Sequence, residues 1–393
     1  MNSEWKTKRL LDIAEFNPRE SLPKGEIAKK VAMDKLQPFY RDIPSYELEP
    51  YSGGVKFRNG DTIMARITPC LENGKTAKVS ILEEGEIGFG STEYIVFRAK
   101  KGTDPDYLFY LVCSPMVREP AIKSMVGSSG RQRVQTDVVQ NLELKCPPTY
   151  IQEKIGGILR RIDDKIALNN SINENLEEQA RAIFAAFISD HQTTTVTVED
   201  IVLTANTGAD AIRKAPIVDR DTGVRCVRVG DMSNQRPVHE WGFAQVTPEI
   251  FKQYQLHKDD IVVTRTASLG LNRLIGEDLS AVYNNGLIRI SVNQDIVYPL
   301  IVYRQFQTED YRNYISRISG ETSVRPNMKI NYLLKYSFDI PSLSNQAELI
   351  SILQPIFETQ ERNISENQTL SSLRDTMLPK LMSGELYVPE LDL

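Results

Sequence analysis

Few residues in this sequence have the types and spacing that catalysis needs. The segment 70–76, CLENGKT, approaches a phosphate-binding loop, but that motif requires a glycine five positions before the Gly of its Gly-Lys pair, and Pro69 stands there. The three histidines, His191, His239 and His257, are isolated, with no HExxH motif and no Cys/His cluster around them. A Gly-x-Ser-x-Gly elbow for a serine nucleophile is also missing from the sequence. The sequence therefore predicts no catalytic residue and no metal site in this chain.

A DNA adenine methyltransferase would be expected to carry an Asn/Asp-Pro-Pro-aromatic tetrapeptide and a glycine-rich cofactor loop. The only Asn-Pro pair, Asn17-Pro18, continues with Arg-Glu. This absence weighs against a self-contained methyltransferase, and we expect no cofactor in this chain.

Glycine- and serine-rich loops that run into basic residues are the best candidates for a binding surface. Two occur, GSSGRQRV at 127–134 and SGETSVRP at 319–326. Such loops can follow a phosphate backbone, and arginine also reads guanine through two hydrogen bonds. For each basic residue, the alternative is that it is a solvated surface charge that contacts no ligand. If the chain binds nucleic acid, the candidate contacts are Lys75, Lys78, Arg131, Arg133, Arg265, Arg273, Arg325 and Lys329.

Two short segments resemble each other, NGDTIMAR at 59–66 and KDDIVVTR at 258–265. Each reads as a polar turn, a short apolar strand and then an arginine. Because Arg66 and Arg265 both end an expected strand, a structural salt bridge is the alternative to a DNA contact. Four aromatic residues are expected in the core rather than on DNA: Tyr40, Tyr46, Tyr51 and Trp241.

The elements that must position these residues are revealed by an internal repeat. The stretch PPTYIQEKIGGIL at 147–159 returns at 341–353 as PSLSNQAELISIL. An offset of 194 residues pairs Pro147 with Pro341 and Gln152 with Gln346, and it aligns the apolar positions as well. The chain is therefore expected to alternate block, long helix, block, long helix.

Each repeat leads into a heptad pattern that predicts a helix, over about 149–189 and about 343–383. A lone amphipathic helix of this length must lay its apolar stripe on a partner, and the natural partner is the other copy. Pro355 inside the second pattern should kink that helix or delay its start. The residues expected to pair the helices are Ile155, Ile158, Ile162, Asn169, Leu176, Leu349, Ile352, Ile356, Asn363 and Leu370.

Asn169 and Asn363 stand at the midpoints of the two expected helices. If the helices pair antiparallel, these side chains meet at the crossing, where a buried polar residue costs stability and fixes register. The alternative is a pair of solvated asparagines on frayed seams.

We therefore expect a mixed α/β fold: two globular α/β domains separated by two long helices that form an antiparallel coiled coil with a pseudo-twofold repeat. The expected boundaries are 1–146 and 193–340 for the globular domains, and 147–192 and 341–393 for the helical spacers.

Composition and charge restrict the function further. The net charge is −5, of which the helical segments carry about −2 and −5 and the blocks about +2 and 0. A chain of this charge does not coat DNA by bulk attraction, although its blocks can contact nucleic acid. The four cysteines are scattered and no apolar run approaches membrane-spanning length, so we expect a cytoplasmic protein with reduced thiols.

Several motifs together resemble the specificity subunits of Type I restriction–modification systems: the Pro-Pro start, Gln152, the run ILRRIDDKIALNNSINENLEEQARAIF and the close LRDTMLPKLMSGEL at 373–386. The resemblance covers the whole chain. It implies a non-catalytic, target-recognising subunit that binds double-stranded DNA, two methyltransferase (modification) subunits and restriction/translocase subunits. S-adenosylmethionine, ATP and Mg would belong to those partners.

Two other classes of function stay open at this point. One is a self-contained DNA methyltransferase or nuclease, and the other is a tandem scaffold that gathers proteins and never touches DNA.

Overall fold

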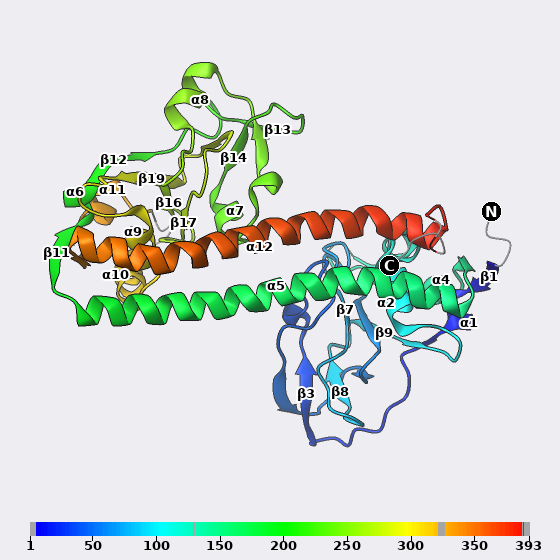
Figure 1. The fold of residues 1–393 in the computed structure, drawn as a ribbon. Helices are drawn as coiled ribbons and strands as arrows, with labels where there is room; N and C mark the ends of the chain where they lie inside the picture. The colour runs from blue at the N-terminus through cyan, green and yellow to red at the C-terminus, as the bar shows by residue number, and fades with distance from the viewer. Residues whose placement is uncertain (1–4, 129, 321–326, 387, 389–393) are drawn as a thin grey trace. The chain divides into compact units, whose positions relative to one another are not determined.

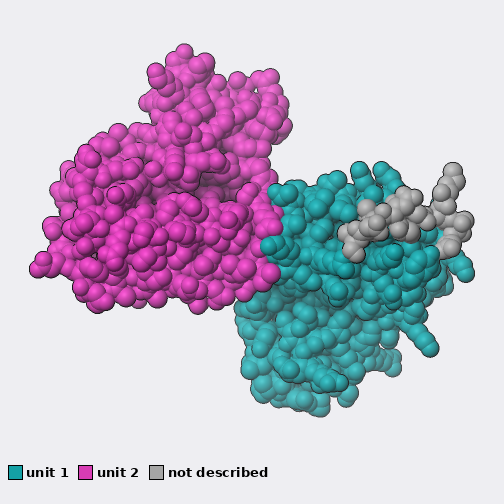
Figure 2. Space-filling view, viewed as in Figure 1, with its two compact units in different colours: residues 1–167, 369–393 teal, residues 168–368 magenta. Residues whose placement is uncertain are grey.

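The structure is a computed structural model that describes residues 5–128, 130–320, 327–386 and 388. The chain forms two compact units (Figure 2): unit 1 comprises residues 1–167 and 369–393, and unit 2 comprises residues 168–368. Two long helices belong to both units, α5 (Thr149–Asp190) and α12 (Leu343–Ser383) (Figure 1).

Unit 1 contains three small sheets. A four-stranded antiparallel sheet has the order β2-β9-β6-β7, and a second sheet has the order β4-β3-β8-β5 with β3 and β8 parallel. The third sheet is the antiparallel pair β1 and β10. The strands are β1 (Lys6–Arg9), β2 (Ala14–Phe16), β3 (Ile27–Val31), β4 (Glu47–Pro50), β5 (Lys56–Phe57), β6 (Thr62–Ala65), β7 (Thr76–Lys78), β8 (Gly88–Gly90), β9 (Tyr94–Ala99) and β10 (Glu143–Cys146), and the helices are α1 (Leu10–Ile13), η1 (Met33–Lys35), α2 (Pro105–Cys113), α3 (Pro115–Lys123) and α4 (Thr136–Gln140).

Unit 2 has the same three kinds of sheet, but its second sheet differs in which strand lies at the edge: the parallel partner β18 is an edge strand, whereas its counterpart β8 in unit 1 is an inner strand. Its antiparallel sheet has the order β12-β19-β16-β17, its second sheet has the order β13-β15-β14-β18 with β14 and β18 parallel, and β11 pairs with β20. The strands are β11 (Thr193–Thr197), β12 (Val202–Thr207), β13 (Ile217–Val218), β14 (Arg225–Val227), β15 (Gly242–Ala244), β16 (Ile261–Thr264), β17 (Asn272–Leu274), β18 (Ala281–Tyr283), β19 (Leu287–Val292) and β20 (Ser337–Pro341), and the helices are α6 (Val198–Ile201), α7 (Val229–Ser233), η2 (Val238–Glu240), α8 (Pro248–Tyr254), α9 (Pro299–Gln305), α10 (Glu309–Gly320) and α11 (Ile330–Leu334).

The main core of each unit includes residues from both long helices. In unit 1, Ile155 and Leu159 of α5 lie in one buried cluster with Leu381 of α12. In unit 2, Leu349 of α12 and Phe184 of α5 lie in one cluster with the strands of the antiparallel sheet. The start of one helix and the end of the other therefore complete each globular core.

The expected long helices and their antiparallel pairing are confirmed. In unit 2 the Asn169 amide donates to Asn367 at 2.9 Å, and the Asn363 amide donates to Asn173 at 2.8 Å, so positions rise along α5 as they fall along α12. In unit 1, Asp163 pairs with Arg374 at 2.7 Å. Helix α12 begins at Leu343, before Pro355, so the expected delay of its start is wrong.

The two midpoint asparagines do not pair with each other as predicted. Asn169 donates to Glu366 and Asn367, whereas Asn363 donates to Asn173, which shifts the contact by about one helical turn. Residues 173 and 367 are repeat equivalents, as are 169 and 363, so these two amide contacts are copies of one interaction.

The predicted seam also differs at the start of α12. Ile352 is 43% exposed, whereas its neighbour Leu353 is fully buried. The buried residues Leu349, Leu353 and Phe357 follow four-residue steps. Such spacing suits a helix packed on a globular core better than a strict heptad seam, because a straight helix turns every 3.6 residues. Among the other predicted seam residues, Ile155, Ile158, Ile162, Leu349, Asn169 and Asn363 are buried, and Leu176, Ile356 and Leu370 are half-buried.

Candidate nucleic-acid interface

Arg66 directly follows β6 and holds a distant segment of unit 1 in place. Its guanidinium donates to the Val134 carbonyl at 3.1 Å, and the Val134 N–H donates back to the Arg66 carbonyl at 2.9 Å. The segment that follows the Gly/Ser loop is thereby fixed beside the end of β6.

Arg265 directly follows β16 and holds the segment around Met328 in unit 2 in the same way. Its guanidinium donates to the Met328 carbonyl at 3.1 Å and to the Asn327 side chain at 2.9 Å, and the Met328 N–H returns to the Arg265 carbonyl at 2.7 Å. The two arginines thus occupy one repeated structural position, where each guanidinium donates to a backbone carbonyl. Within the described residues, neither forms the salt bridge that was the alternative to a DNA contact.

The loop 127–133 in unit 1 presents one clear basic candidate. Val126 and Arg133 exchange backbone hydrogen bonds at its base. Arg133 also forms an ion pair with Glu93 at 2.6 Å, and this guanidinium holds the pKa of the Glu93 carboxyl below its usual value. Arg131 lies between these anchors with an exposed side chain. Within the described part of the chain Arg131 forms no ion pair, so it can contact a ligand without breaking one.

Lys75 and Lys78 are half-buried and engaged inside unit 1. The Lys75 ammonium donates to the Met33 carbonyl at 2.8 Å, and Lys78 forms an ion pair with Asp106 of α2. To contact DNA, either lysine would have to give up these interactions. A solvent-exposed ion pair with a phosphate would gain little more free energy than is lost.

The remaining candidates lie in unit 2. Arg273 stacks over the Trp241 ring, with its guanidinium carbon 5.5 Å from the ring centre, and donates to the Arg236 carbonyl at 3.2 Å. Lys329 is exposed at the N-terminus of α11. Arg325 lies outside the described residues.

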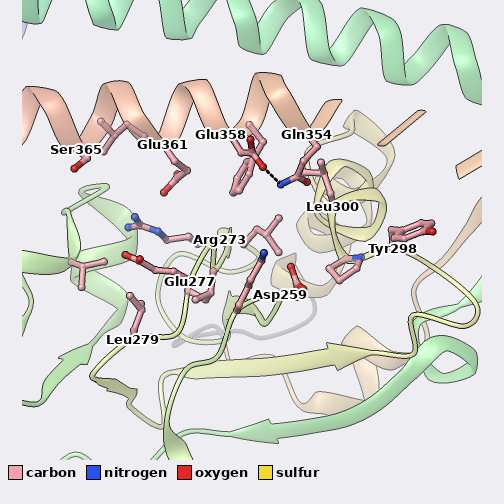
Figure 3. Close-up of a pocket in the computed structure, with 18 of the residues that line it drawn as sticks. Asp259, Arg273, Glu277, Leu279, Tyr298, Leu300, Gln354, Glu358, Glu361 and Ser365 are labelled. Carbon is pink, nitrogen blue, oxygen red and sulfur yellow. Dashed lines mark hydrogen bonds between the residues drawn. The ribbon is translucent and has the colours of Figure 1, made fainter. Parts of the chain in front are cut away.

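Arg273 also borders a pocket of about 540 Å³ between α12, the N-terminus of α9 and the segment after β17. Figure 3 shows Glu358 and Glu361 on α12 facing this space, with Arg273 and Glu277 on the opposite wall. Burial raises the pKa of the Glu361 carboxyl. Because several carboxylates line it, this pocket does not suit a phosphate group.

The residues that the structure describes contain no group of three or more His, Cys, Asp or Glu side chains that could hold a metal ion. None of their helices has the length and apolar character needed to cross a bilayer.

Comparison with known proteins supplies the context for this geometry. The family model for the Type I restriction modification DNA specificity domain matches residues 2–178 and again residues 194–371. The two matches begin close to the start of each globular block and extend into the long helix that follows it.

Individual relatives agree with the family model. Over 157 residues, 38% of this chain, the sequence is 32% identical to the EcoAI specificity subunit of Escherichia coli, and the match spans about a quarter (26%) of that relative. The MjaIX specificity subunit of Methanocaldococcus jannaschii is 23% identical over 99% of this chain and 95% of its own length. These relatives are named as specificity subunits rather than as methyltransferases or nucleases.

The fold has a solved counterpart. The crystal structure of the Type-I restriction-modification system S subunit from M. genitalium matches 96% of this chain and 96% of its own, with a TM-score of 0.58 and 13% identity. At this identity the likeness concerns the fold alone. Because the family model accounts for both halves of the sequence, the chain belongs to the Type I restriction modification DNA specificity family and carries that family's domain twice.

Proposed function

We propose that this chain is the DNA-recognition subunit of a Type I restriction–modification complex and that each globular domain reads one half of a bipartite target. The observation that carries this proposal is the tandem match of the DNA specificity domain at 2–178 and 194–371. Residues 1–146 and 193–340 would be the two readers, and the helical segments 147–192 and 341–393 would form the spacer that separates the half-sites.

Physical reasoning supports a split target. Two readers contact one face of a duplex most easily when their sites are about one helical turn, roughly 10 base pairs, apart. The bases between them are then left unread, and the spacer sets their number.

The DNA-contacting side chains follow from exposure and pairing. Arg131 and Lys329 are exposed and lie in or next to the loops expected to meet DNA. We propose them as phosphate or base contacts, together with Arg325, which lies four residues before Lys329 in the sequence. Arg133 and Arg273 are proposed as secondary contacts, while Lys75, Lys78 and Arg265 would act mainly by holding the surface in shape.

The partners proposed for the chain supply the chemistry. Two repeated helical segments offer two equivalent docking surfaces, which suits two copies of a methyltransferase (modification) subunit and, beyond them, restriction/translocase subunits. S-adenosylmethionine, ATP and Mg would be bound by those subunits. Base flipping and methyl transfer would take place in the modification subunit, since an adenine inside a duplex must leave the stack before it reacts.

A domain exchange tests the proposal. Residues 193–340 are replaced by the corresponding block of another specificity subunit, and methylated adenines are mapped genome-wide in cells that also produce the modification subunit. We expect one half of the bipartite target to change while the other half is retained.

The reciprocal exchange of residues 1–146 is the matched control and should change only the other half. A scaffold that never touches DNA would leave the methylated sequence unaltered in both exchanges, and this result would overturn the proposal.

A further inference from the structure

A glutamine lies in the first turn of each long helix, at repeat-equivalent positions. Gln152 of α5 is 1% exposed and Gln346 of α12 is fully buried. Burying an uncharged amide costs free energy unless its donors and acceptor are all used. Their contacts therefore show what the repeated glutamine does.

In unit 1, the Gln152 side chain joins α5 to α2. Its carbonyl oxygen accepts the backbone N–H of Asp104 at 3.0 Å, and its amide nitrogen donates to the Pro147 carbonyl at 2.9 Å. Asp104 is the N-cap of α2, and its carboxylate accepts the Tyr107 N–H at 2.7 Å. Gln152 thus fixes the residue at which α2 begins.

In unit 2, Gln346 makes the corresponding contacts to α9. Its carbonyl oxygen accepts the Tyr298 N–H at 3.0 Å, and its amide nitrogen donates to the Pro341 carbonyl at 2.9 Å and to the Ile296 carbonyl at 3.0 Å. Tyr298 is the N-cap of α9, as Asp104 is of α2. One arrangement therefore occurs twice, although the residues at the N-cap differ.

Only an amide meets both needs at these positions. Glutamine presents an acceptor and two donors at the end of one side chain, whereas glutamate lacks the donors and lysine lacks the acceptor. The acceptor holds a backbone N–H of the globular domain, and the donor holds the carbonyl that precedes the spacer helix.

The helices held in this way are largely buried in the globular domains. Residues Tyr107–Val112 of α2 are all buried, and most of α9 is buried too. A tilt of a globular domain on its spacer helix must therefore break the bonds of the glutamine at that junction.

We propose that Gln152 and Gln346 are orientation latches that make the subunit selective for one gap length between its half-sites. This inference rests on the proposed function. Adding or removing one base pair rotates a half-site by about 35° about the DNA axis and moves it by roughly 3.4 Å, since about 10 base pairs complete a turn of about 34 Å. A domain whose glutamine bonds are intact resists this reorientation. A domain that has lost them can tilt to contact a half-site that is shifted by one base pair.

The test uses the full-length chain produced together with its modification subunit. Gln152→Met and Gln346→Met keep the side-chain volume and remove the hydrogen bonds. Genome-wide adenine methylation is then measured at the native gap and at gaps one base pair shorter and longer. We expect methylation at the neighbouring gaps, relative to the native gap, to rise by a factor of about 10 to 100, which corresponds to losing the two hydrogen bonds of Gln152 or the three of Gln346.

A control variant that destabilises unit 1 without touching the glutamine distinguishes a latch from a general contribution to stability. Val117→Ala opens a small cavity in the core of unit 1 and leaves Gln152 untouched. This variant should lower methylation by the same factor at the native gap and at the neighbouring gaps. If either Gln→Met variant fails to assemble, Gln→Asn serves instead, since it keeps an uncharged amide but is one methylene too short to hold both partners.

The outcomes separate the two proposals. Unchanged gap preference in both glutamine variants, or a loss that matches Val117→Ala, overturns the latch and leaves DNA recognition intact. If the unaltered chain directs no methylation to a bipartite sequence, the proposed function itself fails and the latch fails with it.

Discussion

Single polar side chains in this protein fix the beginnings of helices, and the repeat preserves them. Asp12 accepts the Arg9 N–H at 2.9 Å, and Asp200 accepts the Thr197 N–H at 2.7 Å. Side-chain hydrogen bonds from Arg9 and Thr197, followed by these backbone bonds, hold the pKa values of the two carboxyls below their usual values. Both helices thus carry an aspartate at their third position that binds the N-cap backbone N–H. Thr197 completes a capping box by accepting the Asp200 N–H at 3.3 Å, whereas the Arg9 side chain has no acceptor and cannot.

Two adjacent glycines in α5 give a test at the same scale. A Cβ added at Gly156 would lie 2.7 Å from the Tyr107 backbone nitrogen and 2.6 Å from the Asp104 carboxylate, whereas one at Gly157 would meet nothing within 4 Å. We expect Gly157→Ala to raise the free energy of unfolding by about 0.5–1 kcal/mol, because alanine favours the helix. Gly156→Ala should lower it by about 1–3 kcal/mol, because the helix must move away from α2.

Denaturant unfolding of the full-length variants measures both changes. Equal effects of the two substitutions would contradict the close packing of α5 on the start of α2.

At the scale of elements, polar contacts set the register of the long helices in unit 2. Around the asparagine pairs, Asn173 donates to the Gln360 carbonyl at 3.3 Å and the Gln360 amide returns to the Asn173 carbonyl at 3.2 Å. Arg304 of α9 adds an ion pair with Glu177 of α5 at 2.6 Å. A purely apolar stripe would tolerate sliding by a turn, whereas each of these bonds is lost on sliding.

The asparagines differ in the number of bonds they donate, which predicts unequal effects. Asn169→Ala removes hydrogen bonds to Glu366 and Asn367, while Asn363→Ala removes one to Asn173. At about 1 kcal/mol for each hydrogen bond, we expect the free energy of unfolding to fall by roughly 2 kcal/mol in Asn169→Ala and by roughly 1 kcal/mol in Asn363→Ala.

Asn175→Ala is the control on the same helix, because this side chain is exposed. Thermal and denaturant unfolding should show a change within about 0.5 kcal/mol for it. An Asn169→Ala variant as stable as the control would mean that these contacts do not define the register.

At the scale of the whole chain, two features bear on DNA binding. The domain occurs twice, and the net charge is −5. Phosphate neutralisation supplies much of the affinity of proteins for DNA, so a chain with a net charge of −5 gains little from it.

We therefore expect the isolated chain to bind its own bipartite target weakly, with a dissociation constant above about 1 μM at physiological salt. Addition of the modification subunit should tighten the complex and restore specificity. Fluorescence anisotropy with the target duplex and a scrambled duplex measures both. Tight and sequence-specific binding by the chain alone would contradict this expectation.

The sequence by itself determined the tandem repeat, the two long helices and the family, because helical periodicity and repeat spacing are local properties of the chain. It also marked Gln152 and Gln346 as repeated, without revealing the N-cap residues that they hold. Only the tertiary structure decided that Lys78 pairs with Asp106, that Arg265 holds a carbonyl of Met328, and that Asn169 meets Asn367 rather than Asn363. These contacts join residues from 28 to 198 positions apart, and the packing of short strands and loops selects them rather than any local pattern.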